Sequence, residues 1–118
     1  MEPVEINAGA WYLRALRADD RVDDRPALTE LGETDADYVA RRAADWESDA
    51  AYSWAVCDPT TGELLAEIVL NRGGAGVRSR VRSGYDDAAA AAEKSVRRFA
   101  QAALGMPARH ISNPLVES

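Results

Sequence analysis

The residues whose types and spacing best suit chemistry are three arginines that alternate along one segment. Arg78, Arg80 and Arg82 stand two positions apart in VRSRVRSGY, so in an extended strand their side chains share one face. Guanidinium groups bind carboxylates and phosphates through paired hydrogen bonds. The spacing predicts a site for a small anion or for the acidic surface of a partner chain. The simpler alternative is a strand face exposed to solvent.

The other chemically capable residues lack recognisable partners. His110 is the only histidine, and no second residue of a catalytic pair can be identified from the sequence. Cys57 has neither a second cysteine nor a flanking basic residue, which predicts a buried, inert thiol. An aspartate cluster lacks the ligand spacing and glycine of a calcium loop, so we expect a solvated loop and no metal site at Asp19, Asp20, Asp23 and Asp24.

Hydrophobic patterns predict the elements that position these residues. We expect strands at 11–16, 52–57, 63–70, 77–85 and 108–112, with the second and third joined as a hairpin by DPTTG. We expect helices at 26–31, 35–49 and 86–104, the last containing an alanine run that ends at Gly105. The fold class is therefore α/β (α+β): an antiparallel or mixed sheet of four or five strands with packed helices.

Composition predicts a single domain, residues 1–118. Hydrophobic residues make up 47% and charged residues 29%, and no apolar run approaches the about 20 residues that span a bilayer. The N-terminus does not read as a secretory signal, so we expect a cytoplasmic protein without membrane contact. The net charge of −6 argues against nucleic-acid binding. That charge is uneven, because the first 70 residues are strongly acidic and the remainder is net basic.

Several segments, in this order, resemble the GNAT acyltransferase superfamily, particularly its RimJ/RimL-like N-acetyltransferase branch. The matching stretches are WYLRALRADD, YVARRAADW, YSWAVCDPTTGELLAEIVL, GY at 84–85, RRFAQAALGM and RHISNP. The resemblance implies a GNAT-like sheet and acyl transfer from acetyl-CoA. Asn113 matches the asparagine of the family's N-x-x-S segment, but Val116 stands in place of its serine.

The resemblance breaks at the cofactor loop. In the family, a basic, glycine-rich loop opens the long helix, and its backbone N–H groups hold the pyrophosphate of acetyl-CoA. Here Tyr85 is followed directly by Asp86, Asp87 and Ala88, so the glycines and the basic residue of that loop are absent. Each close pair of like charges costs about 1–4 kcal/mol in a half-buried site. We therefore expect no cofactor, and no acetyl-CoA bound in the usual way.

Relative to a complete GNAT fold, the sequence lacks the later helix and strands. We therefore expect a fold truncated at its C-terminal end, with an open sheet edge that favours a homodimer. The predicted function is that of a degenerate GNAT-like pseudoenzyme that binds a small anionic ligand or a protein partner. The candidate contact residues are Arg78, Arg80, Arg82, Tyr85 and Asn113.

The alternative prediction is an enzyme, in one of two forms. The first is an N-acetyltransferase that binds acetyl-CoA in an unusual way. The second is a GNAT fold recruited to cofactor-free chemistry in a biosynthetic pathway, which would need a deep apolar pocket with a few polar groups.

Overall fold

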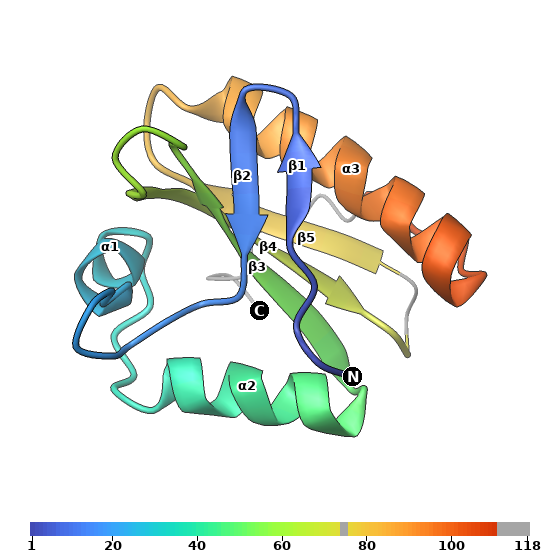
Figure 1. Cartoon of the computed structure of the whole chain (residues 1–118), viewed down its shortest axis with the longest axis horizontal. Coiled ribbons are helices and arrows are strands. Elements are labelled where there is room, and N and C mark those ends of the chain that lie inside the picture. Colours follow the sequence, from blue (N-terminus) through green and yellow to red (C-terminus); the bar gives the residue numbers. More distant parts are fainter. Residues whose placement is uncertain (74–75, 111–118) are drawn as a thin grey trace.

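The computed structural model describes residues 1–73 and 76–110, which form one six-stranded sheet and three helices (Figure 1). The strands lie in chain order across the sheet, and every neighbouring pair is antiparallel except the last, which is parallel. The elements are β1 Ile6–Ala8, β2 Trp11–Arg14, α1 Arg25–Glu30, α2 Tyr38–Ser48, β3 Ala51–Cys57, β4 Leu64–Asn71, β5 Gly76–Val81, α3 Asp86–Leu104 and β6 Arg109–His110.

The predicted fold class is confirmed, and the sheet has six strands where about four or five were predicted. The sixth strand is β1, whose three residues are too few to predict a strand; it forms because Gly9, at φ 64°, turns the chain back onto β2. Two predicted strands are also shorter than expected. The first ends at Arg14 rather than 16, and β5 ends at Val81, so Arg82 lies beyond it.

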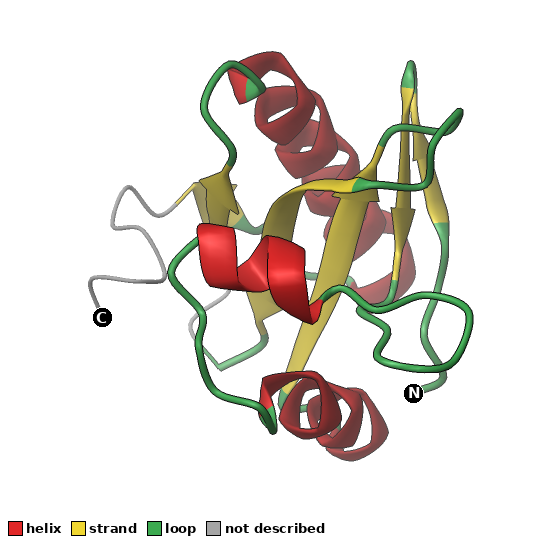
Figure 2. Cartoon of the chain, turned by 90° about the vertical axis from the view of Figure 1, so that its left-hand side faces the viewer, coloured by secondary structure: helices red, strands yellow, loops and turns green. Residues whose placement is uncertain are grey.

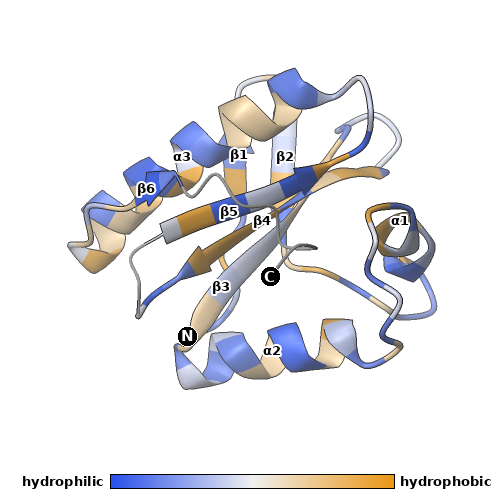
Figure 3. Ribbon diagram, turned by 180° about the vertical axis from the view of Figure 1, so that it is seen from behind, coloured by the Kyte–Doolittle hydropathy of each residue, from blue (hydrophilic) through white to orange (hydrophobic). Residues whose placement is uncertain are grey.

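Helix α3 packs against one face of the sheet, and α1 and α2 lie across the sheet from it (Figure 2). The alanine run does more than favour a helix. Ala88, Ala92, Val96 and Ala100 are all fully buried against the sheet, because their small side chains allow the helix to approach its strands closely. Hydrophilic and hydrophobic residues alternate along the same helix (Figure 3).

Helix α2 is anchored by aromatic side chains. Trp46 packs against Tyr52 and Trp54 with ring centroids 4.9 Å and 5.2 Å apart, and its indole N–H donates to the Ser53 carbonyl at 3.2 Å. Trp54 in turn meets Phe99 of α3 edge to face. No helix within residues 1–73 and 76–110 is both long enough and apolar enough to cross a membrane.

Candidate functional site

The turn that joins β5 to α3 is short and already hydrogen-bonded. Gly84 adopts φ 90°, a conformation that a residue with a side chain rarely takes. The Tyr85 carbonyl accepts hydrogen bonds from the backbone N–H groups of Ala88 at 3.0 Å and Ala89 at 3.3 Å. A helix normally offers four free N–H groups at its start. The bond from Ala89 is the first regular bond of the helix. Of the four N–H groups, that of Ala88 is bonded to the Tyr85 carbonyl and that of Tyr85 donates to the Arg82 carbonyl at 3.1 Å, which leaves a smaller site for an anion.

The two remaining N–H groups belong to acidic residues. Asp86 and Asp87 occupy the first turn of α3, and both are exposed. Carboxylates at this position stabilise a helix by interacting with the positive end of its dipole. The same carboxylates repel any phosphate that approaches the helix end, as the sequence predicts.

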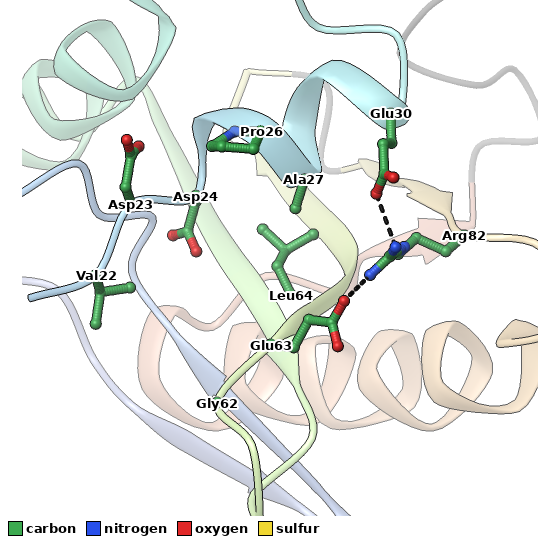
Figure 4. Close-up of a pocket in the computed structure, with 10 residues that line it drawn as sticks. All are labelled: Val22, Asp23, Asp24, Pro26, Ala27, Glu30, Gly62, Glu63, Leu64 and Arg82. Carbon is green, nitrogen blue, oxygen red and sulfur yellow. Dashed lines mark hydrogen bonds and ion pairs between the residues drawn. The ribbon is translucent and has the colours of Figure 1, made fainter.

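The cation nearest this helix end is held by two glutamates. Arg82 Nη2 lies 2.8 Å from Glu30 Oε2 of α1, and its Nη1 donates to Glu63, which precedes β4. Figure 4 shows the two carboxylates approaching the guanidinium from different elements. The bond to Glu63, more than any other contact, raises the pKa of Arg82. Arg82 therefore ties three segments together and offers little free positive charge to an anion.

Two adjoining hollows share Arg82, Glu30 and Glu63 and form an open acidic groove beside the turn (Figure 4). Their volumes are about 330 and 460 Å³. Asp23 and Asp24 line the first, and Tyr85 lines the second. Carboxylates outnumber cations among these lining residues, so the groove favours a cationic group over a polyphosphate.

The middle arginine of the predicted series lies inside the protein. Arg80 is buried and pairs with two carboxylates: its Nε donates to Glu67 Oε1 at 2.7 Å and its Nη2 to Glu33 Oε1 at 3.1 Å. Glu67 lies on β4 directly opposite Arg80 and is fully buried. The sequence did not predict this pair, although Glu67, the single acid within the apolar strand LLAEIVL, was a signal for it.

Helix α2 completes this buried polar cluster. The Tyr38 hydroxyl donates to Glu67 Oε2 at 2.6 Å and accepts from Arg42 Nε at 2.9 Å. Burial, followed by the nearby Glu67 carboxylate, raises the pKa of Tyr38 to about 12. The guanidinium carbon of Arg80 lies 5.2 Å from the centroid of the Tyr38 ring. Every polar group named here has a hydrogen-bond partner within the protein. The cluster therefore fixes α2 to the sheet.

The three arginines therefore do not form one continuous basic face. Arg78 and Arg80 lie on the same side of β5, but Arg80 is paired internally and Arg82 lies in the following turn. Arg78 differs from both, because its Nε is buried and has no hydrogen-bond partner among the described residues. Their role as ligand contacts stays a prediction, and Asn113 lies outside the described residues.

His110 has a partner that the sequence did not reveal. Its Nδ1 lies 2.7 Å from Glu93 Oε1, which joins β6 to the buried side of α3. The two residues are 17 positions apart, so only the return of the chain after α3 brings them together. A carboxylate that orients an imidazole is a common arrangement for proton transfer. The His110 side chain is half exposed and could reach a ligand.

The aspartate cluster is only partly solvated, which corrects the expectation of a solvated loop. Asp24 is buried, accepts two hydrogen bonds from Arg14 at 2.8 and 2.9 Å, and accepts a third from the Arg17 backbone N–H at 2.7 Å. Asp19 is exposed, and hydrogen bonds led by that from Arg17 lower its pKa to about 2. Within residues 1–73 and 76–110, no three metal-ligating side chains gather to form a metal site.

The Cys57 thiol is buried, as the sequence predicts. The Cys57 thiol lies inside β3, and desolvation raises its pKa to about 11. A thiol with so high a pKa carries almost no thiolate at neutral pH and is a poor nucleophile.

Two solved structures share this architecture. The first belongs to a Vibrio cholerae protein assigned as a ribosomal-protein-serine acetyltransferase; it has a TM-score of 0.71 and 14% identity, over 87% of this chain and 70% of that one. The second is an acetyltransferase from Agrobacterium tumefaciens, with a TM-score of 0.60 and 22% identity over 88% of this chain and 70% of that one. No protein-family profile and no curated protein match the sequence. The chain therefore has a GNAT-type acetyltransferase fold.

Proposed function

We propose that this chain is a binding protein built on the acetyltransferase fold, and that it does not carry out ordinary acetyl-CoA-dependent N-acetyl transfer. The observation that carries the proposal is the charge at the start of α3. Asp86 and Asp87 are exposed where the helix would otherwise attract an anion. Arg82, the nearest cation, is already held by Glu30 and Glu63.

The size of the electrostatic effect supports this reading. Coenzyme A carries a pyrophosphate and a further phosphate, so several negative charges would approach the two carboxylates. Each close pair costs about 1–4 kcal/mol at the dielectric of a half-buried site. Since about 1.4 kcal/mol changes a dissociation constant tenfold, two such pairs weaken binding by about thirtyfold or more.

Calorimetric titration with acetyl-CoA and with free coenzyme A tests the proposal. We expect no saturable binding by the native protein at ligand concentrations up to about 1 mM. A double variant, Asp86→Ser with Asp87→Ser, should bind coenzyme A more tightly than the native protein because the repulsion is removed. Asp20→Ser removes one exposed charge far from α3 in the sequence and is the control. Micromolar binding of acetyl-CoA by the native protein would contradict the proposal.

A second copy of the chain is one partner that we propose, and a homodimer stays our expectation. The uneven charge supports contact between unlike surfaces, because the groove beside α1 is acidic whereas Lys94, Arg97 and Arg98 lie on α3. Such contacts strengthen at low ionic strength.

The alternative is an N-acetyltransferase that binds acetyl-CoA in an unusual way. The contact between His110 and Glu93 favours it. The imidazole could accept the proton that an amine loses when it attacks a thioester, with Glu93 fixing the ring. The cofactor-free version needs a deep apolar pocket, whereas the two hollows beside the turn are open and lined by several carboxylates.

Release of free thiol from acetyl-CoA in the presence of a small primary amine separates the two readings. We expect the native protein to release no more thiol than buffer alone, and His110→Gln to behave identically. The enzyme reading requires measurable release that falls about 100-fold or more in His110→Gln, the usual loss when a general base is removed. Arg97→Gln, which alters an exposed residue of α3, should leave any such activity unchanged.

A further inference from the structure

We propose that the outer edge of β1 binds an extended segment of a partner protein, which adds to the sheet as a further strand beside α3. This inference rests on the proposed binding function and names the surface and the class of partner. Strand β1 forms the end of the sheet that is remote from β6. Two observations carry the inference: backbone groups that β1 turns away from β2, and a groove between these groups and α3.

The turn between β1 and β2 determines which backbone groups face outward. It consists of Gly9, at φ 64°, followed by Ala10, whose φ is negative. A glycine with positive φ at the first of two positions is the pattern of a type II′ hairpin, and the residues that flank such a turn exchange two hydrogen bonds. Hydrogen-bonded and non-hydrogen-bonded pairs then alternate along the strands. Ala8 and Ile6 therefore bond to β2, whereas the N–H and C=O of Asn7 point outward.

A side-chain contact agrees with this phase. The Trp54 indole N–H donates to the Val4 carbonyl at 2.7 Å, so the backbone of Val4 faces the interior, as that of Ile6 does. By the same alternation, the backbone of Glu5 faces outward with that of Asn7. Both residues are exposed. N–H and C=O groups that are exposed at a sheet edge form a template for an added strand.

A groove of about 430 Å³ lies between this edge and α3. Residues 4–7 form its strand side, and its helix side is formed by Ser95, Arg98, Phe99 and Ala102. Ile6 and Phe99 pack against the hydrophobic core but stay partly exposed. An added strand would cover both side chains, because alternate residues of a strand beside β1 point toward α3.

The charges beside the groove indicate the chemistry of the segment. Arg98 lines the groove and Lys94 lies one turn before it on α3; both are exposed and form no ion pair within residues 1–73 and 76–110. No acidic residue follows Glu93 on this helix. Glu5 points to the opposite face of β1, where its hydrogen bond with Tyr12 raises the pKa of that phenol. The complementary segment therefore carries apolar side chains and a carboxylate on the face that meets α3.

The position of α3 disfavours a second copy of β1 as the added strand. Two β1 edges that pair antiparallel are related by a twofold axis normal to the sheet, which places both α3 helices on the same face of the joined sheet. Helix α3 extends past β1 (Figures 1 and 3), so the two helices would need the same space beside the new junction. A single extended segment of a different protein avoids this conflict.

The experiment uses a synthetic peptide of about seven residues, within the usual length of a strand, with blocked ends and the sequence Glu-Thr-Val-Thr-Val-Thr-Glu. Its valines and glutamates share one face, so a carboxylate reaches Arg98 in either strand direction. The full chain is titrated with the peptide and followed by amide NMR. We expect saturable binding, with the amides of Glu5 and Asn7 shifted and slowed in hydrogen exchange.

Two altered peptides separate backbone pairing from charge. The same peptide N-methylated at its threonines should not bind, because those nitrogens face β1 when the valines face α3. A peptide with lysine in place of both glutamates should bind more weakly than the original, because its ends are repelled by Arg98 and Lys94.

Matched pairs of variants locate the site on the protein. Asn7→Pro removes one outward N–H that β2 does not use, so the fold should persist while binding is lost. Asn7→Ala keeps that N–H and should bind as the native protein does. Arg98→Gln should weaken binding by about two- to fivefold, the usual range for an exposed ion pair, whereas Arg97→Gln, whose side chain does not line the groove, should leave it unchanged. The amide spectrum of each unbound variant checks its fold.

Three results would overturn the inference: no binding of the original peptide, equal binding of its N-methylated form, or equal binding by Asn7→Pro and Asn7→Ala. Unchanged binding by Arg98→Gln would overturn the assigned acidic chemistry. Any of these, together with an absence of acetyl-CoA binding, would refute the β1 site while leaving the proposed binding function standing. Micromolar binding of acetyl-CoA by the native protein would refute the proposed function, whatever the peptide does.

Discussion

Replacing Arg80 by methionine should lower the free energy of unfolding by about 3–5 kcal/mol, measured by urea denaturation. The substitution removes the guanidinium that pairs with Glu67, a carboxylate that is fully buried. It also breaks the link to Glu33, which precedes α2. Breaking a buried ion pair by removing one member is costly because the other member cannot regain its hydration.

A second substitution shows whether the unpaired charge is the cause. Combining Arg80→Met with Glu67→Gln removes that charge but keeps an oxygen that can accept from the Tyr38 hydroxyl. The double variant should therefore be more stable than Arg80→Met alone. Arg97→Met changes an exposed arginine of α3 and should alter stability by less than about 0.5 kcal/mol. If the double variant were the least stable of the three, the buried-charge explanation would be wrong.

Asp24→Asn should have the second large effect, a loss of about 3 kcal/mol of stability. The Asp24 carboxylate makes a two-pronged contact with the buried Arg14 guanidinium and also accepts the Arg17 backbone N–H. An amide cannot accept from all three donors, and it leaves Arg14 buried without a counter-charge. Thermal unfolding followed by circular dichroism measures the change.

Asp20→Asn is the matched control because Asp20 lies in the same loop but is exposed. It should leave the midpoint of unfolding nearly unchanged. Equal losses in the two variants would mean that net charge, rather than the Arg14 contact, sets the stability of this loop.

The sequence predicted the helices and strands that are specified by residues close together along the chain. The β3–β4 hairpin follows from two apolar segments around DPTTG, and α3 follows from its alanine run and its closing Gly105; both are confirmed. The GNAT-type fold is confirmed as well, because two solved acetyltransferase structures share this architecture.

The parts that the sequence did not predict depend on contacts between distant residues. Glu67 pairs with Arg80 only because β4 and β5 are in register, and an acid within an apolar strand does not by itself reveal which cation lies opposite it. Asp24 differs from the exposed Asp19 because it contacts Arg14, which lies ten positions before Asp24 in the sequence. Arg78 and Arg80 do lie on one side of β5, as their alternation predicted, but Arg82 does not belong to that face because β5 ends at Val81.

The protein thus has the fold of an acetyltransferase with an altered charge distribution at the helix end beside its groove. Similar folds support many functions, so function must be argued from the site. Here the site offers carboxylates at the start of α3 and a guanidinium already neutralised by glutamates. Both features support our proposal of a binding function.

Amide NMR of the native protein during addition of coenzyme A most directly tests whether the start of α3 excludes phosphates. Our account predicts that the backbone signals of Tyr85, Asp86 and Asp87 stay in place up to about 1 mM coenzyme A. Saturating shifts of these three signals at micromolar concentrations would show that the helix end does hold the cofactor and would contradict the account.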